Sequence, residues 1–123
     1  MTASYWGYQT LCDCSHANLG KMQDRDNIYR FSKTLVDRIA MEPIGEPIIL
    51  PTAMHLPDKA GYSLIQLIQT SNIVAHFVDS NRSIYIDCFS CKPFDVGVVE
   101  DTIREFFDVD KIRVNFITRH AED

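Results

Sequence analysis

The chain has 123 residues and a formal net charge of −5. This length fits one domain, and a chain of this size buries roughly two-thirds of its unfolded surface. The acidic balance argues against general nucleic-acid binding, which depends on neutralising phosphates. No apolar run approaches the roughly 20 residues that a membrane span needs. The first ten residues show neither the basic segment nor the apolar core of a signal peptide. We therefore expect a cytoplasmic protein that contacts neither membranes nor nucleic acid.

The first half of the chain predicts a strand, a helix and a second strand. The segment from Tyr5 to Cys12 is rich in β-forming residues and predicts a strand. A helix is indicated next by apolar residues spaced by three, four and four positions. These residues are Ile28, Phe31, Leu35 and Ile39. The run from Ile48 to Leu50 predicts a short strand between two prolines, and Thr52 to Gly61 predicts a loop.

Three strands are predicted in quick succession in the second half. They span Tyr62–Gln69, Asn72–Val78 and Ser83–Cys91. The short turns between them, at Thr70-Ser71 and at residues 79–81, favour antiparallel pairing.

A second helix and a closing strand complete the pattern. Asp95 can cap the helix, and alternating residues from Lys111 to Thr118 predict the strand. The apolar helix face comprises Val98, Val99, Thr102, Ile103, Phe106 and Phe107. This order predicts an α+β two-layer sandwich, in which two helices cover one face of an antiparallel sheet.

The other face of that sheet carries several apolar candidates. They are Val74, Val78, Tyr85 and Phe89. An apolar sheet face that no helix covers favours a homodimer built sheet against sheet.

The residues of most chemical interest surround Ser71. Ser63 precedes it by eight residues, His76 follows it by five and Cys91 by twenty. Taken singly, each has an ordinary structural role, as a turn former, a core histidine or a small apolar side chain. In paired antiparallel strands they can also meet across the sheet. The register that decides this stays open at the level of sequence.

The four cysteines are expected to be reduced thiols. They are Cys12, Cys14, Cys88 and Cys91. Cys88 and Cys91 are three residues apart on a predicted strand and so point to opposite faces. This spacing disfavours a zinc site, and we expect no metal. A redox Cys-x-x-Cys pair is disfavoured too, since that motif works at the start of a helix.

Taken together, these segments resemble the prokaryotic S-adenosylmethionine decarboxylase proenzymes. That family shows a Gly-x-Ser strand, a Glu-Ser-His motif, a histidine five residues after that serine, and a strand ending in Ile-Asp-x-Phe-x-Cys. The matching stretches are Gly61–Leu64, Thr70–Asn72, His76 and Ile86–Cys91. Their spacings match the family without a gap, and the resemblance runs from about Trp6 to Arg119.

The resemblance implies that the proenzyme cuts itself between Thr70 and Ser71. The products would be a β chain of residues 1–70 and an α chain of residues 71–123 that begins with a pyruvoyl group made from Ser71. Ser63 would donate a hydrogen bond to the cleavage intermediate, and His76 would be the base for β-elimination. The pyruvoyl cofactor condenses with the substrate amine, carbon dioxide leaves, and Cys91 returns a proton. The implied reaction makes the aminopropyl donor for spermidine synthesis.

Several positions depart from the family pattern, and two of them bear directly on the site. Thr70 replaces the glutamate before the cleavage serine, and we expect this to be tolerated because the acyl shift uses the backbone carbonyl. Ser80 stands where the family has a ribose-binding glutamate, and Asp79 beside it is the candidate substitute in substrate binding. Three hypotheses follow: an S-adenosylmethionine decarboxylase, a decarboxylase with the same cofactor that acts on arginine or ornithine, and a non-catalytic homologue that does not process itself.

Overall fold

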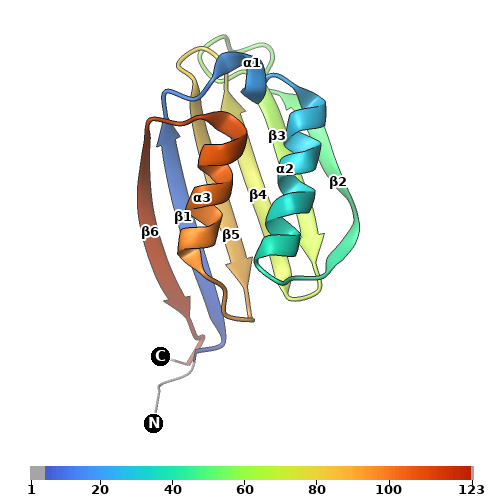
Figure 1. Ribbon diagram of the computed structural model, residues 1–123, viewed down its shortest axis with the longest axis vertical. Helices are drawn as coiled ribbons and strands as arrows, with labels where there is room; N and C mark the ends of the chain where they lie inside the picture. Colours follow the sequence, from blue (N-terminus) through green and yellow to red (C-terminus); the bar gives the residue numbers. More distant parts are fainter. Residues whose placement is uncertain (1–4, 123) are drawn as a thin grey trace.

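The computed structural model describes residues 5–122, and in this part of the chain three helices cover one face of a six-stranded antiparallel sheet (Figure 1). The strands are β1 (Gly7–Ser15), β2 (Pro43–Thr52), β3 (Gly61–Ile68), β4 (Ser71–Val78), β5 (Ser83–Ser90) and β6 (Lys111–Arg119). The helices are α1 (Leu19–Met22), α2 (Arg25–Arg38) and α3 (Val96–Phe107). The predicted α+β two-layer sandwich is confirmed, with one more short helix than the sequence pattern indicates.

The strand order in the sheet is β2-β3-β4-β5-β1-β6. Strands β2 to β5 follow one another as neighbours, whereas β1 is inserted between β5 and β6. Gly7 pairs with Arg119, so the two ends of the described chain lie close together at the same end of the sheet (Figure 1). The β3–β4 turn lies at this same end, and the β2–β3 loop lies at the opposite end.

Both long helices begin after an aspartate that caps the first turn, and the second of these caps is the predicted Asp95. Asp24 accepts hydrogen bonds from the N–H groups of Asp26 and Asn27, and Asp95 accepts one from Gly97. The short helix α1 is capped by Asn18, which accepts from the N–H of Lys21 at 3.0 Å. A four-residue helix is too short to show an apolar period, which is why the sequence pattern did not reveal it.

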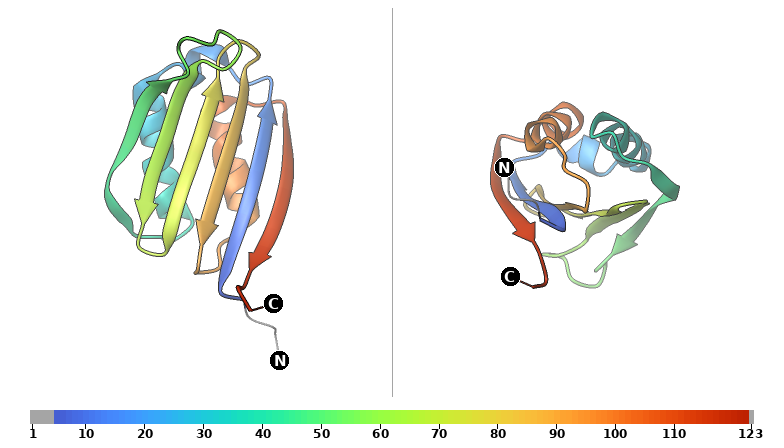
Figure 2. Two further views of the ribbon diagram at one scale, coloured as in Figure 1. Left: turned by 180° about the vertical axis from the view of Figure 1, so that it is seen from behind. Right: turned by 90° about the horizontal axis from the view of Figure 1, so that it is seen from below.

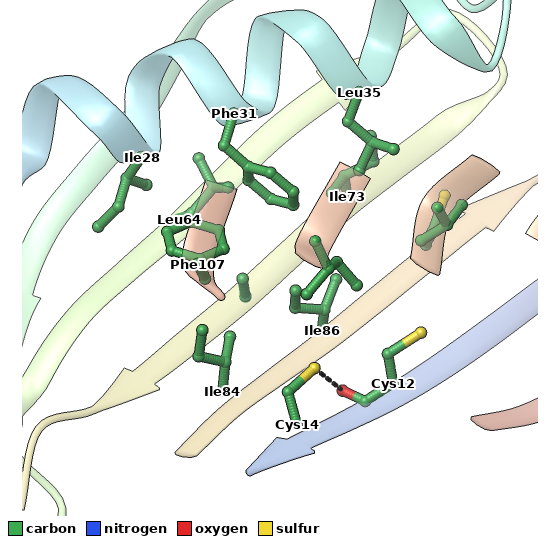
Figure 3. Packing of buried hydrophobic residues seen from close by; sticks show 14 of the residues in the cluster. Cys12, Cys14, Ile28, Phe31, Leu35, Leu64, Ile73, Ile84, Ile86 and Phe107 are labelled. Carbon is green, nitrogen blue, oxygen red and sulfur yellow. Dashed lines mark hydrogen bonds between the residues drawn. The ribbon is translucent and has the colours of Figure 1, made fainter. Parts of the chain in front are cut away.

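The core lies between the helices and the sheet (Figure 3). The predicted face of α2 is buried, with Ile28, Phe31 and Leu35 fully covered. The ring of Phe107 in α3 lies 4.9 Å from that of Phe31 and 5.2 Å from that of Phe77 in β4. This aromatic group joins both helices to the sheet.

Three of the four cysteines belong to this core as free thiols. Cys12, Cys14 and Cys88 are buried, whereas Cys91 is exposed. Burial raises the pKa of Cys12 to about 11 and the pKa values of Cys14 and Cys88 to about 12, because a thiolate loses its hydration there.

Strand β2 is longer than predicted. It includes Pro47 and Pro51, which the sequence pattern treats as boundaries. The strand lies at the sheet edge, where a proline without an N–H interrupts no ladder on its outer side. A register shift between Ile44 and Ile48, with Gly45 at φ +68°, accommodates the irregular start of the strand.

Figure 2 shows the sheet face that the helices leave uncovered. Its exposed side chains are largely apolar. We call it the open face. Its exposed apolar side chains are Ile48, Leu50, Ile65, Leu67, Val74, Tyr85 and Ile117. The prediction that Val74 and Tyr85 are exposed here is confirmed, and Phe89 is half-buried.

Val78 was predicted on the open face but is only 6% exposed. The loop of residues 53–60 folds back onto this end of the sheet. His76 on one side of Val78 bonds the carbonyl of Lys59, and the N–H of Asp79 on the other side bonds the carbonyl of Ala60. Val78 is therefore covered between two anchoring points of the loop.

Candidate active site

The predicted site residues form two groups at opposite ends of the sheet. The first group surrounds the turn between β3 and β4. This turn is Gln69-Thr70, one residue earlier than predicted, so that Ser71 is the first residue of β4. Ser71 pairs with Ile68 in β3 and with Ser90 in β5, which places Cys91 beside Thr70.

The Thr70 carbonyl in this first group is held by a backbone donor. The N–H of Cys91 donates to the Thr70 oxygen at 3.0 Å. A donor in this position stabilises negative charge that develops on the oxygen when the carbonyl carbon is attacked. Ser71 carries the adjacent hydroxyl, and its Oγ accepts a hydrogen bond from Asn72 Nδ2 at 3.2 Å.

The Thr70 side chain is anchored toward the helices. Ser90 Oγ donates to Thr70 Oγ1 at 2.8 Å, and Thr70 Oγ1 donates to Met41 Sδ at 3.3 Å. Ser90 in turn accepts the N–H of Lys92 and is fully buried. These contacts hold the backbone on the N-terminal side of the Thr70 carbonyl. The sequence does not indicate the anchoring role of Ser90, because the pattern shows only a residue inside the predicted strand Ser83–Cys91.

The second group lies near the start of β3. Ser63 and His76 are cross-strand partners on the open face, and Ser63 Oγ lies 2.8 Å from His76 Nδ1. Thr52, the last residue of β2, lies 2.6 Å from Ser63 through its Oγ1. The sequence pattern places Thr52 in a loop and gives no sign that it belongs to this group.

The hydrogen bonds determine the tautomer of His76. Its Nε2 lies 2.8 Å from the carbonyl oxygen of Lys59, which can only accept. Nε2 therefore carries the proton, and in the neutral ring Nδ1 is an acceptor that faces Ser63. The unprotonated Nδ1 of His76 thus faces the Ser63 hydroxyl at 2.8 Å.

The two groups are far apart within one chain. Ser71 and His76 are five residues apart on β4, which corresponds to about 16 Å. The structure brings Ser63 to His76 and Cys91 to Thr70 and Ser71, but it does not bring the first pair to Ser71. The register that the sequence left open places His76 of β4 and Asp87 and Phe89 of β5 on the same face of the sheet, the open face.

The two predicted substrate-binding residues lie just beyond β4, at the end of the second group. Ser80 is exposed, and Asp79 is partly buried. Within the described residues, Asp79 Oδ1 is a buried oxygen without a hydrogen-bond partner. It borders a cavity of about 310 Å³ that is also lined by Pro51, Met54 and Tyr62.

A larger cavity, of about 600 Å³, lies at the end of the first group. Trp6, Phe89 and Arg119 line it, and Phe89 precedes Cys91 by two residues on the same face. The rings of Trp6 and Phe89 are 5.9 Å apart, and Trp6 is 57% exposed. The cavity combines an open aromatic surface with a guanidinium group.

Comparison with solved structures relates the fold to a known one. The crystal structure of the adenosylmethionine decarboxylase from Aquifex aeolicus VF5 superposes with a TM-score of 0.80, at 17% sequence identity, covering 96% of this chain and 93% of that chain. At this level of identity the match shows a shared fold. A search of curated protein sequences found no match.

The family model of S-adenosylmethionine decarboxylase matches residues 8–120. The chain therefore belongs to the S-adenosylmethionine decarboxylase family, as the sequence resemblance implies. This family places it among decarboxylases, which are carboxy-lyases. None of the described helices is long and apolar enough to cross a membrane.

Proposed function

We propose that the protein is a pyruvoyl-dependent S-adenosylmethionine decarboxylase that cleaves its own chain between Thr70 and Ser71. The observation that carries this proposal is the Thr70 carbonyl, which accepts the N–H of Cys91 at 3.0 Å and adjoins the Ser71 hydroxyl. In an acyl shift, Ser71 Oγ attacks the Thr70 carbon and the amide becomes an ester. The N–H of Cys91 stabilises the charge that forms on the Thr70 oxygen.

Cleavage then requires a base that removes the α-proton of Ser71. Elimination releases Thr70 as a carboxylate, and water replaces the nitrogen of residue 71, which leaves as ammonia. His76 is the base in this proposal, because its Nδ1 is unprotonated, and Ser63 is the hydrogen-bond donor to the intermediate.

Since His76 and Ser71 of one chain are about 16 Å apart, we propose that the second group comes from another copy of the chain. The open face exposes apolar side chains across β2 to β6, which fits burial against an identical face. A two-fold axis between the sheets and across the strands places the Ser71 end of one protomer over the His76 end of its partner. The homodimer then has two complete sites.

The residues around Ser71 fit a pyruvoyl group. Thr70 and Ser90 hold the backbone before the cleavage point, and Cys91 presents an exposed thiol beside it. A pyruvoyl group supplies a carbonyl that binds the substrate amine and withdraws electrons from the bond to the departing carboxylate. Cys91 is the group that returns a proton to the substrate α-carbon.

For the substrate, the aromatic surface of Trp6 and Phe89 supports a nucleoside. This surface lies at the Ser71 end of the open face, and stacking on aromatic rings suits an adenine base. S-adenosylmethionine is therefore the first candidate, and its product would serve spermidine synthesis.

A second candidate substrate is arginine or ornithine. The observation that favours it is the unpartnered oxygen of Asp79 beside a cavity, at the end where the family has a glutamate and this chain has Ser80. A buried carboxylate oxygen suits the cationic end of either amino acid.

An intact-mass spectrum of the purified protein tests the proposal. We expect two fragments that divide between Thr70 and Ser71, the second lighter than its sequence by one ammonia. Release of carbon dioxide from S-adenosylmethionine, arginine and ornithine, measured side by side, then identifies the substrate. The Ser71→Ala chain should keep its full-length mass and should release no carbon dioxide from any of the three. A wild-type chain of unbroken mass would contradict the proposal and favour the non-catalytic homologue.

A further inference from the structure

Thr52 contacts both members of the Ser63–His76 pair. Its Oγ1 lies 2.6 Å from Ser63 Oγ, 3.4 Å from His76 Nδ1 and 3.1 Å from the carbonyl oxygen of Gly61. The side chain is partly buried, and it pairs through the backbone with Gly61 at the start of β3. The hydroxyl is thus held between three polar groups by the strand that positions it.

Counting protons gives the direction of each bond. His76 donates its one ring proton to the carbonyl of Lys59. In the 2.8 Å contact between Ser63 Oγ and His76 Nδ1, Ser63 is therefore the donor. Ser63 Oγ is then an acceptor toward Thr52, whose one hydroxyl proton is shared between Ser63 Oγ at 2.6 Å and the carbonyl oxygen of Gly61 at 3.1 Å. The resulting chain runs from Thr52 to Ser63 to His76 to Lys59.

We infer that Thr52 is a positioning residue for self-cleavage: by donating to Ser63 Oγ, it orients the Ser63 hydroxyl toward the cleavage intermediate. This inference rests on the proposed function. When Ser63 turns its proton toward an oxyanion, its bond to Nδ1 is lost, and the bond from Thr52 still fixes its oxygen. Thr52 also keeps a hydroxyl within 3.4 Å of the freed Nδ1.

The local structure suits this role. A threonine has few allowed rotamers because it is branched at Cβ, so its hydroxyl direction is set by the strand. Thr52 also directly follows Pro51, whose fixed φ limits the backbone before it. The hydroxyl therefore points at Ser63 without a large loss of side-chain entropy on assembly.

The test compares Thr52→Val, which keeps the shape and removes the hydroxyl, with Thr52→Ser, which keeps the hydroxyl. Full-length chains are made in a cell-free translation reaction, and their conversion to two fragments is followed by intact mass. Loss of one hydrogen bond should slow conversion of Thr52→Val roughly tenfold. Thr52→Ser should convert at nearly the wild-type rate. Thr118→Val, at an exposed strand threonine, is the matched control and should convert like the wild type.

The stability of each variant is measured separately, on a Ser71→Ala background that stays uncut, and the thermal midpoints should agree. A Thr52→Val chain that converts at the wild-type rate would overturn the inference, and so would Thr52→Ser being as slow as Thr52→Val. These results would leave the proposed function intact, because the wild type would still be cleaved. A wild-type chain that stays uncut would overturn both.

Discussion

Ser71 begins β4, and His76 lies five residues further along the same strand and about 16 Å away. Both residues are parts of the proposed cleavage site. Because they cannot meet within one chain, the site needs Ser71 from one chain and His76 from a second. The separation follows from the extended strand and from its pairing on both sides with β3 and β5. A local rearrangement that joined the two residues would break this central strand.

Co-expression of two inactive variants should therefore restore cleavage. Ser71→Ala lacks the residue that is modified, and His76→Ala lacks the base. In a mixed dimer, Ser71 of the second chain meets His76 of the first, and one of the two sites is complete. We expect each variant alone to stay uncut, and the His76→Ala chain to be cleaved in the mixture, as measured by intact mass.

The control mixture combines Ser63→Ala with His76→Ala. These changes damage the same end of the chain, so every pairing lacks either Ser63 or His76. This mixture should show no recovery. Recovery in it, or no recovery when Ser71→Ala and His76→Ala are combined, would contradict the two-chain site.

The exposure of Cys91 makes it selectively reactive. The other three thiols are buried and protonated, so iodoacetamide at neutral pH should label Cys91 alone and unfolding in urea should expose all four. Labelled protein that has already been cleaved should lose decarboxylation, since the proton donor is blocked. Cys91→Ala should still be cleaved but should decarboxylate poorly. Full activity of Cys91→Ala without side products would remove it from the mechanism.

The buried thiols predict a loss of stability in alkali. In the fold, the pKa of Cys88 is about 12, whereas an exposed thiol has a value of 9.0. The unfolded chain therefore releases this proton first, and the stabilising effect of the raised pKa is full below pH 9 and declines as the pH rises toward 12. At pH 10.5 one such thiol lowers the free energy of unfolding by roughly 2 kcal/mol.

Urea unfolding of a Ser71→Ala chain at pH 8 and pH 10.5 measures this loss. Lysines and tyrosines titrate in the same range, so the comparison needs a variant without one thiol. Cys88→Val keeps a similar volume and should lose less stability between the two pH values than the parent chain. An equal loss in both chains would show that Cys88 does not contribute.

Gly61 is required by a close contact between strands. A Cβ at this position would lie 1.6 Å from the carbonyl oxygen of Phe77 in β4. Gly61→Ala should therefore force β3 away from β4 beside Ser63 and destabilise the fold by at least about 2 kcal/mol. Self-cleavage should slow as well. Gly20→Ala is the control, because its nearest contact is an ordinary 3.4 Å, and it should unfold at the wild-type urea midpoint.

The sequence predicts the elements well but the register poorly. Apolar spacing identifies both long helices, and runs of β-forming residues between turn residues identify all six strands. The turn was expected at Thr70-Ser71 and lies at Gln69-Thr70. A turn displaced by one residue shifts the partner of every residue in a hairpin by two, so Ser63 would have opposed Val78 rather than His76. Neighbours in the site therefore depend on a detail that residue preferences do not fix.

Thr52 shows a second limit. Prolines on both sides of Ile48–Leu50 indicate a short strand, and only the position of β2 at the sheet edge allows the strand to continue through Pro51 to Thr52. Edge position is a property of the assembled sheet. The separation of Ser71 from His76, in contrast, follows from five residues of predicted strand and was available from the sequence.

The place of β1 in the sheet determines what cleavage does to the molecule. A cut after Thr70 assigns β1, β2 and β3 to one product and β4, β5 and β6 to the other, yet β1 stays hydrogen-bonded between β5 and β6. Strands of the two products therefore alternate within one sheet, and we expect neither product to fold without the other. The processed protein should therefore unfold in one cooperative transition despite the break in its backbone. Its two chains should separate only when the whole sheet unfolds.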